Sequence, residues 1–288
     1  MTGLRIGVIG DLHTHWDDID VAQFNTTDYD LLFFTGDLGG GSVDSSLRVA
    51  RTISRLNVET LVMPGNNDTG DIHQLAAELS HRSGLKRLTE IRQGAGDTIN
   101  SIRLCGYSSH RYTTPATDVT LIAARPHSMG GPALTFAEHM AATYGIDSME
   151  TSAQRLKELV DAAQTAELIF LAHNGPTGLG GEPADMWGCD FKPDGGDWGD
   201  PDLSEAIAYA VETGRRVLAV VAGHMHLTTK CGQERPWRRE HDGILYVNAA
   251  RVPRIYAGSD DVMRHHVALH VHGRGVEIEE VEVPQDPG

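Results

Sequence analysis

The sequence is poor in cysteine, in long apolar runs and in basic residues, and each shortage excludes a class of protein. Its three cysteines are far apart and lack the Cys-x-x-Cys spacing of a structural zinc site: they are Cys105, Cys189 and Cys231. They indicate neither a disulfide framework nor a thiolate metal site, and they fit a reducing cytoplasm.

Long apolar segments are also missing. The first apolar run, from Leu4 to Ile9, is short and has no basic leader or small-residue cleavage site. No stretch approaches the roughly 18 apolar residues that a membrane span requires. We therefore expect a cytoplasmic protein without a secretory signal and without membrane association.

Basic residues number 24 against 40 acidic ones, and the formal net charge at pH 7 is -16. This charge repels polyanions over the general surface and disfavours broad binding to nucleic acid. A small anionic substrate is still compatible, because bound cations would dominate the field of a local site. The length of 288 residues and a 40% hydrophobic content predict a single globular domain, 1–288, with a substantial core.

Short runs of Val, Ile, Leu and Phe predict buried strands. The first six are Arg5–Ile9, Leu31–Phe34, Thr60–Met63, Ile102–Tyr107, Leu168–Ala172 and Val217–Ala222, and three C-terminal ones are Ile244–Val247, Val267–Val271 and Val276–Val283. Apolar residues at helical spacing predict helices within 43–53, 72–79 and 149–163. This order predicts an α/β fold of two packed sheets with helices outside them and a site at the strand ends.

The ends of two helices carry sequence signals. Asp147 with Glu150, and Asp202 with Glu205, predict capping boxes. Gly214 is placed to end the second of these helices.

Two segments lack a simple strand or helix pattern. Residues 110–146 contain scattered Pro, Thr and Gly before a helical pattern at 134–144, and we expect a cap over the cleft. Residues 174–201 are rich in glycine and aspartate, and a loop of this length is typical of lids and binding loops. We therefore expect a mobile, lid-like insertion there.

Five motifs with metal-ligand side chains stand at or near the ends of predicted strands. They are Asp11-Leu12-His13, Gly36-Asp37, Gly65-Asn66-Asn67-Asp68, His173 and Gly223-His224-Met225-His226. Each alone has an ordinary explanation, as a chance pair, a turn or a core histidine. The last is more specific, because side chains two apart on an extended segment share a face and can converge. Together and in this order they predict a dinuclear metal site.

In order and context the motifs resemble the calcineurin-like metallophosphoesterase superfamily, from Asp11 to His226 and through the trailing strands. The resemblance implies a four-layer α/β/β/α sandwich of two mixed sheets, with metals held by loops at the strand ends. It assigns one metal to Asp11, His13 and His226, the other to Asn66, His173 and His224, and Asp37 to both as the bridge. The region around His173-Asn174-Gly175-Pro176 is also similar to a cyanobacterial and plant branch of the superfamily.

Carboxylate, imidazole and amide oxygen accept Mn, Fe, Zn and similar divalent ions, so the donors do not identify the metals. Two such ions about 3.5–4 Å apart lower the pKa of a bound water to roughly 7. We therefore expect a hydrolase of a small phosphate monoester or diester that attacks with a hydroxide bridging two divalent metal ions.

Asn67 departs from the superfamily pattern, in which the third motif usually has histidine at this position. That histidine is expected to donate a proton to the leaving oxygen, whereas an amide donates only a hydrogen bond. Losing a general acid typically costs about 10²–10⁴ in rate. Asp68 would orient the histidine in the usual pattern, so here we expect it to cap the following helix or to bind Asn67. Asn67 and Asp68 are the predicted catalytic positions.

Three histidines are candidate replacements for the missing acid, although a solvated surface histidine is the simpler explanation for each: His15, His110 and His127. Arg251 and Arg254 are candidates for binding a phosphate bidentately, with surface ion pairing as the simpler alternative.

A second metal site is conceivable at His266, His270 and His272, which share a face of a predicted strand, but an exposed histidine-rich face also explains them. Two other functions stay open: a metal-bound scaffold without turnover, and a nuclease, which the acidic balance disfavours. Retention of all seven presumed ligands argues against the scaffold.

Overall fold

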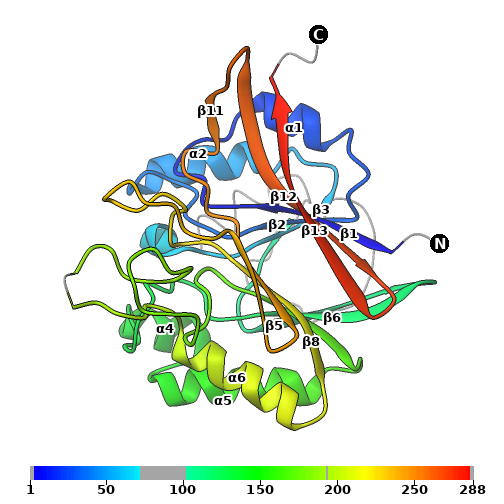
Figure 1. Cartoon of the computed structure of the whole chain (residues 1–288), viewed down its shortest axis with the longest axis vertical. Coiled ribbons are helices and arrows are strands. Elements are labelled where there is room, and N and C mark those ends of the chain that lie inside the picture. Colours follow the sequence, from blue (N-terminus) through cyan, green and yellow to red (C-terminus); the bar gives the residue numbers. More distant parts are fainter. Residues whose placement is uncertain (1–2, 72–101, 193, 286–288) are drawn as a thin grey trace.

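A computed structural model describes residues 3–71, 102–192 and 194–285, which form two sheets packed face to face with helices on their outer sides (Figure 1). The first sheet has the order β11-β12-β1-β2-β3-β4, with β13 beside β12. Its strands are β1 (Leu4–Ile9), β2 (Leu31–Phe34), β3 (Glu59–Val62), β4 (Ile102–Leu104), β11 (Ile255–Ala257), β12 (Val262–His272) and β13 (Gly275–Pro284).

The second sheet has the order β5-β6-β7-β8-β10-β9. Its strands are β5 (Ser108–Thr114), β6 (Thr117–Ala123), β7 (Glu167–Leu171), β8 (Arg216–Ala222), β9 (Arg238–His241) and β10 (Ile244–Asn248). Both sheets are mixed: β1 to β4 run parallel, as do β6, β7, β8 and β10, while β12, β5 and β9 pair antiparallel with their neighbours.

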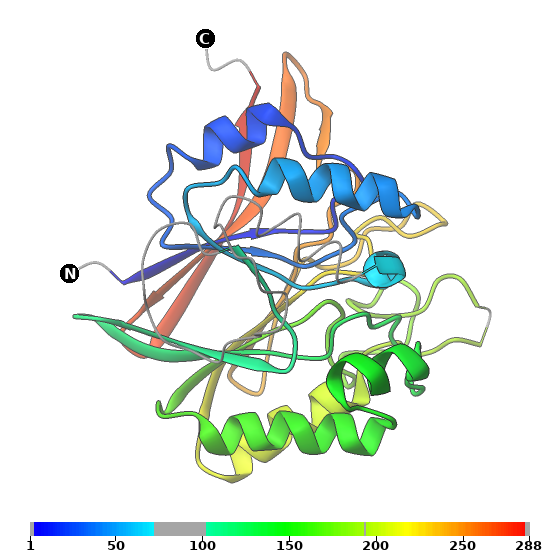
Figure 2. The same ribbon diagram turned by 180° about the vertical axis from the view of Figure 1, so that it is seen from behind.

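Helices cover the two outer faces (Figure 2). On the first sheet lie α1 (Asp18–Phe24) and α2 (Val43–Ile53), and on the second lie α4 (Ala137–Tyr144), α5 (Met149–Ala162) and α6 (Pro201–Glu212). A short 3-10 helix, η1 (Asn66–Asp71), follows β3. The predicted four-layer α/β/β/α sandwich of two mixed sheets is confirmed.

Burial on both faces explains why the central strands are continuous apolar runs rather than alternating ones. In β2, Leu31 and Phe33 pack between the sheets, whereas Leu32 and Phe34 pack under α1 and α2. In β7, Ile169 faces the first sheet and Phe170 faces the outer helices. The parallel strands therefore have fixed positions, and the loops at their carboxyl ends start from a rigid base.

The predicted apolar strands are confirmed, with boundaries that move by a few residues. The predicted cap at 110–146 is wrong in its first part, because residues 110–123 belong to the antiparallel pair β5 and β6. Threonine favours strands as other β-branched residues do, so scattered Thr did not indicate a loop here. The short strands β9 and β11 and helix α1 were also missed.

Helices α2 and α5 are confirmed, and the helical pattern at 72–79 lies outside the described residues. The capping boxes were misplaced. The N-cap of α5 is Ser148, whose side chain accepts from the backbone of Thr151, and the N-cap of α6 is Asp200. Gly214 does follow the end of α6 with a positive φ of 81°, the conformation that favours glycine there.

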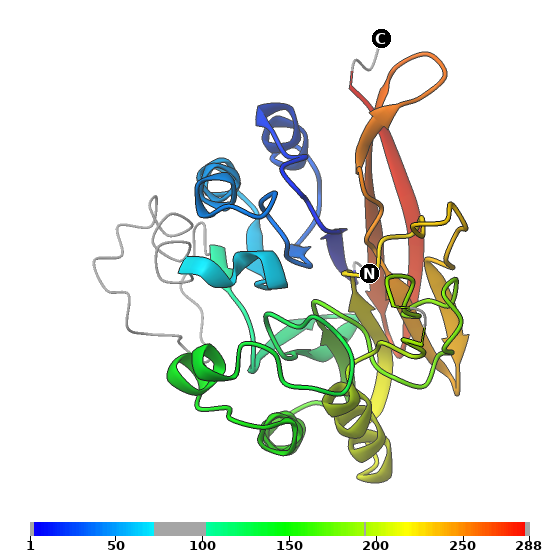
Figure 3. The same ribbon diagram turned by 90° about the vertical axis from the view of Figure 1, so that its left-hand side faces the viewer.

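The insertion 174–201 is packed against the second sheet at Trp187, and its role as a lid stays a prediction. Trp187 lies in the core cluster of the second sheet and is 1% exposed. Its ring touches Gly175 so closely that a Cβ there would lie 2.1 Å from it. Glycine at this position therefore permits close packing rather than mobility. Figure 3 views the molecule from the side on which the loops at the strand ends lie, and the insertion lies on that side.

Within the three described stretches, each helix is too short or too polar to cross a membrane.

Candidate metal centre

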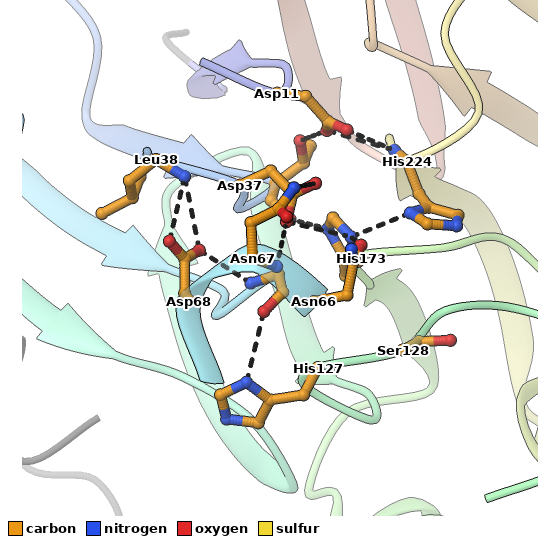
Figure 4. Close-up of polar contacts among 12 residues, drawn as sticks. Asp11, Asp37, Leu38, Asn66, Asn67, Asp68, His127, Ser128, His173 and His224 are labelled. Atoms are coloured by element: carbon orange, nitrogen blue, oxygen red, sulfur yellow. Dashed lines mark hydrogen bonds and ion pairs between the residues drawn. The ribbon is translucent and has the colours of Figure 1, made fainter. Parts of the chain in front are cut away.

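The donors predicted from sequence meet at one place, where the carboxyl ends of parallel strands from both sheets face each other. Figure 4 shows five of them, Asp11, Asp37, Asn66, His173 and His224. Asp11 and His13 follow β1, Asp37 follows β2, Asn66 opens η1 after β3, His173 follows β7, and His224 and His226 follow β8. Strands far apart in the sequence therefore deliver their side chains to a common edge.

One donor group consists of Asp11, His13 and His226, whose ligand atoms lie within 4.8 Å of one another. The Nε2 atoms of the two histidines are 3.1 Å apart. A second group consists of Asp37, His173 and His224, again within 4.8 Å.

Asn66 joins the second group through its amide oxygen. Its Oδ1 lies 3.0 Å from Nε2 of His173, and that nitrogen lies 3.1 Å from Nδ1 of His224. The grouping therefore matches the ligand sets that the family resemblance implied.

Asp37 stands between the two groups. Its Oδ2 is 3.7 Å from Nε2 of His13, and its Oδ1 is 3.7 Å from Nε2 of His173. Each carboxylate oxygen thus faces one group, which is the arrangement that a bridging ligand requires.

The chemistry of these donors fits divalent cations. Ring nitrogens lie 3.1 Å apart in the pairs of His13 with His226 and His173 with His224, so two possible ligand atoms meet in each group. Carboxylate and amide oxygens converge on the same points, and such mixed N and O sets suit Mn, Fe and Zn.

Three of the donors sit in strained backbone. His13, Asp37 and His224 have positive φ values of 41°, 50° and 68°, in the left-handed region that residues other than glycine rarely adopt. Such conformations cost on the order of 1–3 kcal/mol each and persist where surrounding structure enforces them. Here the backbone N–H of His13 donates to the carbonyl of Asp37 at 2.9 Å, so the two strained turns hold each other.

Thr35, the residue after β2, orients one ligand from each group. Its Oγ1 donates to Asp11 at 2.8 Å, and its carbonyl lies 2.7 Å from Nδ1 of His173. This contact leaves Nε2 of His173 directed at the centre, as partners of metal-binding histidines usually do. Sequence analysis missed Thr35, although its place directly before Gly36-Asp37 was a signal.

Mutual electrostatics shift the ionisation of the buried donors. Burial opposes ionisation of Asp11, but His173, His226, His13 and His224 outweigh it and lower the pKa of Asp11. Burial together with His173 lowers the pKa of His224 to about 3. Burial opposes protonation of His173, but Asp37 and Asp11 outweigh it and raise the pKa of His173. Asp11 is thus held ionised and His224 neutral, which are the forms that bind cations.

Asn67 binds the carboxylate of Asp37. Its backbone N–H donates to Oδ1 of Asp37 at 2.9 Å, and its side-chain amide donates to Oδ2 at 2.7 Å. Asn67, which stands where the family usually has histidine, thus donates to both carboxylate oxygens of Asp37.

Among the described residues, Asp68 has no hydrogen bond to Asn67, and the helix at 72–79 that it was expected to cap lies outside them. Asp68 accepts from the backbone N–H groups of Leu38 (3.1 Å) and Gly65 (3.0 Å) and from Oγ of Ser46 (3.2 Å). Burial and the nearby Asp37 raise the pKa of Asp68 to about 7. Its contacts tie together the loops after β2 and β3, which carry Asp37 and Asn66.

Two of the three candidate acids are unsuited to that role. Burial and His139 lower the pKa of His127 to about 3, and burial with Arg103 lowers the pKa of His110 to about 4. Both rings are therefore neutral near pH 7 and lack the imidazolium proton that a histidine general acid donates. His15 is half-buried, with Nδ1 at 3.1 Å from the carbonyl of Leu12.

The prediction that Arg254 binds substrate is corrected, because its guanidinium is 1% exposed and donates to Asp20 at 2.9 Å. Arg251 lies 3.6 Å from Glu282 and 4.8 Å from the ring centroid of Tyr256. Both arginines therefore have partners within the protein, and a role for Arg251 in substrate binding stays a prediction.

The second histidine cluster does not form a site among the described residues. His266 is buried with Nε2 at 2.7 Å from the hydroxyl of Tyr29, while His270 and His272 pack ring against ring. A buried hydrogen bond and a half-buried ring pair account for the histidine-rich face.

Comparisons with known proteins agree with this geometry. The family model described as calcineurin-like phosphoesterase matches residues 4–227, and no curated protein matches the chain in sequence. A dimetal phosphatase from Danio rerio has a similar structure, with a TM-score of 0.56, 12% identity, and coverage of 99% of this chain and 100% of that one.

Two further solved structures share the fold. The TT1561 protein of Thermus thermophilus has a TM-score of 0.55 and 12% identity, over 96% of this chain and 99% of that one. A putative 5'-nucleotidase from Staphylococcus aureus has a TM-score of 0.55 and 12% identity, over 99% of this chain and 55% of that one. The family match spans more than half of the sequence and includes all seven donors, so the chain belongs to the calcineurin-like phosphoesterase family.

Proposed function

We propose that the protein is a metal-dependent hydrolase of a small phosphate monoester or diester, acting in the cytoplasm with two divalent ions of the Mn, Fe or Zn type. The observation that carries the proposal is the position of Asp37, whose two oxygens each lie 3.7 Å from a histidine of a different donor group. Two ions bound at such a centre would polarise a phosphoryl group and supply hydroxide near neutral pH.

The protein's own residues position the reaction. Asp11, His13 and His226 would hold one ion, and Asn66, His173 and His224 the other, with Asp37 shared. Thr35 and Asn67 keep ligands in place through the hydrogen bonds described above. Fixed donors of this kind contribute to catalysis because they need little reorganisation during the reaction.

Asn67 restricts the substrates. Its amide donates a hydrogen bond to Asp37 and has no proton to give to a leaving oxygen. We therefore expect fast hydrolysis of esters whose leaving group is already a weak base, such as aryl esters, and slow hydrolysis of alkyl esters.

The experiment couples metal analysis to hydrolysis of chromogenic aryl phosphate monoesters and diesters. Wild type is compared with Asp37→Asn, and Asp118→Asn is the matched control, since Asp118 is exposed on the hairpin of β5 and β6. The proposal predicts metal-dependent turnover that Asp37→Asn abolishes and the control retains. Bound metal without turnover on any ester, in wild type and in Asn67→His alike, would favour the scaffold instead.

A further inference from the structure

Three polar side chains outside the candidate metal centre meet between the loop after β6 and helix α4. His127 lies in that loop, and His139 and Tyr144 lie on α4. Nε2 of His127 is 3.4 Å from Nε2 of His139 and 3.3 Å from the hydroxyl oxygen of Tyr144. One ring nitrogen of the loop thus faces two polar atoms of the helix. We call these three residues the α4 site.

The backbone fixes which nitrogen of His127 faces the helix. Burial and His139 lower the pKa of His127 to about 3, so the ring is neutral near pH 7. Its Nδ1 lies 3.2 Å from the carbonyl of Gly65, and a carbonyl only accepts, so Nδ1 carries the proton. Nε2 therefore has a lone pair on the side of α4. Metal-binding histidines are usually oriented in this way, by a carbonyl or carboxylate at the other ring nitrogen.

The distances distinguish an ion site from a hydrogen-bonded cluster. Hydrogen bonds in proteins are most often about 2.7–3.0 Å long, whereas the two contacts of Nε2 are 3.4 and 3.3 Å. Ligands that bind a tetrahedral zinc ion at about 2.0–2.1 Å lie about 3.3–3.4 Å from one another. The two separations therefore match two edges of a zinc tetrahedron better than they match direct hydrogen bonds.

The backbone of this region also requires a stabilising contact. His127 and Phe136, the N-cap of α4, have positive φ values of 58° and 54°, and such conformations cost on the order of 1–3 kcal/mol each. Among the eight described residues of α4, Met140 alone is buried, and the side chain of the N-cap makes no capping hydrogen bond. A helix this short is marginal by itself. Its position on the loop therefore depends on contacts such as those of His139 and Tyr144.

We propose that the α4 site binds a zinc ion that holds helix α4 against the loop after β6. Zinc accepts two imidazoles together with oxygen ligands, and the half-buried positions of His139 and Tyr144 leave access from solvent. The α4 site has no carboxylate, so we expect a lower affinity than at the metal centre. Purified protein should keep the ions of the centre and take up a further ion when zinc is added. The role of this ion is structural and independent of hydrolysis.

The first test counts and places zinc ions in the whole chain equilibrated with free zinc. Elemental analysis gives the number of ions, and anomalous diffraction at the zinc edge gives their positions. We expect one ion more than the metal centre holds, at about 2.0–2.1 Å from Nε2 of both His127 and His139.

Variants assign the additional ion to the α4 site. His139→Phe keeps a ring on α4 but offers no ligand atom, so we expect it to lose this ion and to retain those of the metal centre. The matched control is His241→Gln, because His241 is exposed on β9. The control should take up as much zinc as wild type.

Hydrogen exchange measures whether the ion holds the helix. Free zinc at about 100 times the dissociation constant of the α4 site should slow amide exchange in α4 by about 10²-fold, because the helix opens only after the ion leaves. His139→Phe should show no change in α4 exchange on addition of zinc.

The inference is overturned by any of three results: no ion between His127 and His139, equal zinc uptake in wild type and His139→Phe, or bound zinc that leaves α4 exchange unchanged. The same crystals show the ions of the metal centre separately. An ion at the α4 site beside an empty centre would support the inference while the proposed hydrolase fails, and a filled centre without the additional ion would do the opposite.

Discussion

Two buried polar clusters lie at the same edge of the sandwich, and they are built on opposite principles. In the cluster around Arg125, charges of opposite sign meet, with Nε 2.9 Å from Asp202 and Nη2 2.8 Å from Asp200. In the metal centre, groups of the same kind meet, with the ring nitrogens of His13 and His226 3.1 Å apart.

The difference shows which cluster requires a ligand. Burial disfavours the charge of Arg125, but Asp200 and Asp202 outweigh it and raise its pKa. Ser128 and Asn174 also donate to Asp200, so this cluster is largely completed by the protein's own groups. In the candidate metal centre the carboxylates face histidines rather than a guanidinium, and we expect divalent cations to complete this cluster.

Asp37→Asn is expected to have the largest effect of the variants that distinguish the two clusters. Removing the shared carboxylate weakens both donor groups, so we expect metal content to fall and hydrolysis to drop by at least about 10³-fold. Elemental analysis and aryl phosphate turnover measure the two effects. Full metal content with normal turnover would mean that Asp37 does not bridge.

Arg125→Met tests the other cluster. It leaves Asp200 and Asp202 buried without their cation, which typically costs about 3–5 kcal/mol. We expect this loss in the free energy of unfolding from urea titrations, with metal content per folded chain unchanged. Arg111→Met is the control, because Arg111 pairs with Asp118 on an exposed hairpin and should leave the midpoint nearly unchanged. Equal midpoints in both variants would contradict a structural role for the cluster.

Asn67→His probes the centre by adding a proton donor. We expect hydrolysis of alkyl phosphates to rise by about 10²-fold, with a smaller gain for aryl phosphates, whose leaving groups need less protonation. Asn67→Ala is the control that removes the contact to Asp37 without supplying an acid. If Asn67→His and Asn67→Ala change the hydrolysis rates of alkyl and aryl phosphates by the same factors, the histidine does not act as a proton donor.

An effect that appears only below about pH 6.5 comes from a buried histidine outside both clusters. Burial and Arg103 lower the pKa of His110 to about 4, so the unfolded chain takes up this proton first as the pH falls. The stability contribution is complete above about pH 6.5 and is lost toward pH 4, with a slope of about 1.4 kcal/mol per pH unit per proton. Urea titrations at several pH values measure this slope. In His110→Gln the free energy of unfolding should fall less steeply with falling pH, whereas the exposed His241→Gln should keep the wild-type slope.

Much of the fold and of the centre was predictable, because the sequence patterns that indicate them lie within short stretches of the chain. Runs such as Leu31 to Phe34 are apolar on both faces, and each ligand stands directly after a strand or opens the next turn. Parallel strands then bring these positions to one edge whatever their distance in the sequence.

Long-range partners were not predictable. Asp20 meets Arg254 across 234 positions, so nothing near Arg254 in the sequence showed that its charge is already neutralised. The packing of Trp187 likewise depends on close approach by Gly175, and composition alone made that glycine look like a sign of mobility.

The most direct test is the number and position of divalent ions in protein purified with manganese, iron or zinc. Elemental analysis should give about two ions per chain, and anomalous diffraction should place them about 3.5–4 Å apart on either side of Asp37. A chain that binds no ion, or a single ion away from Asp37 with the donor groups turned apart, would contradict the account.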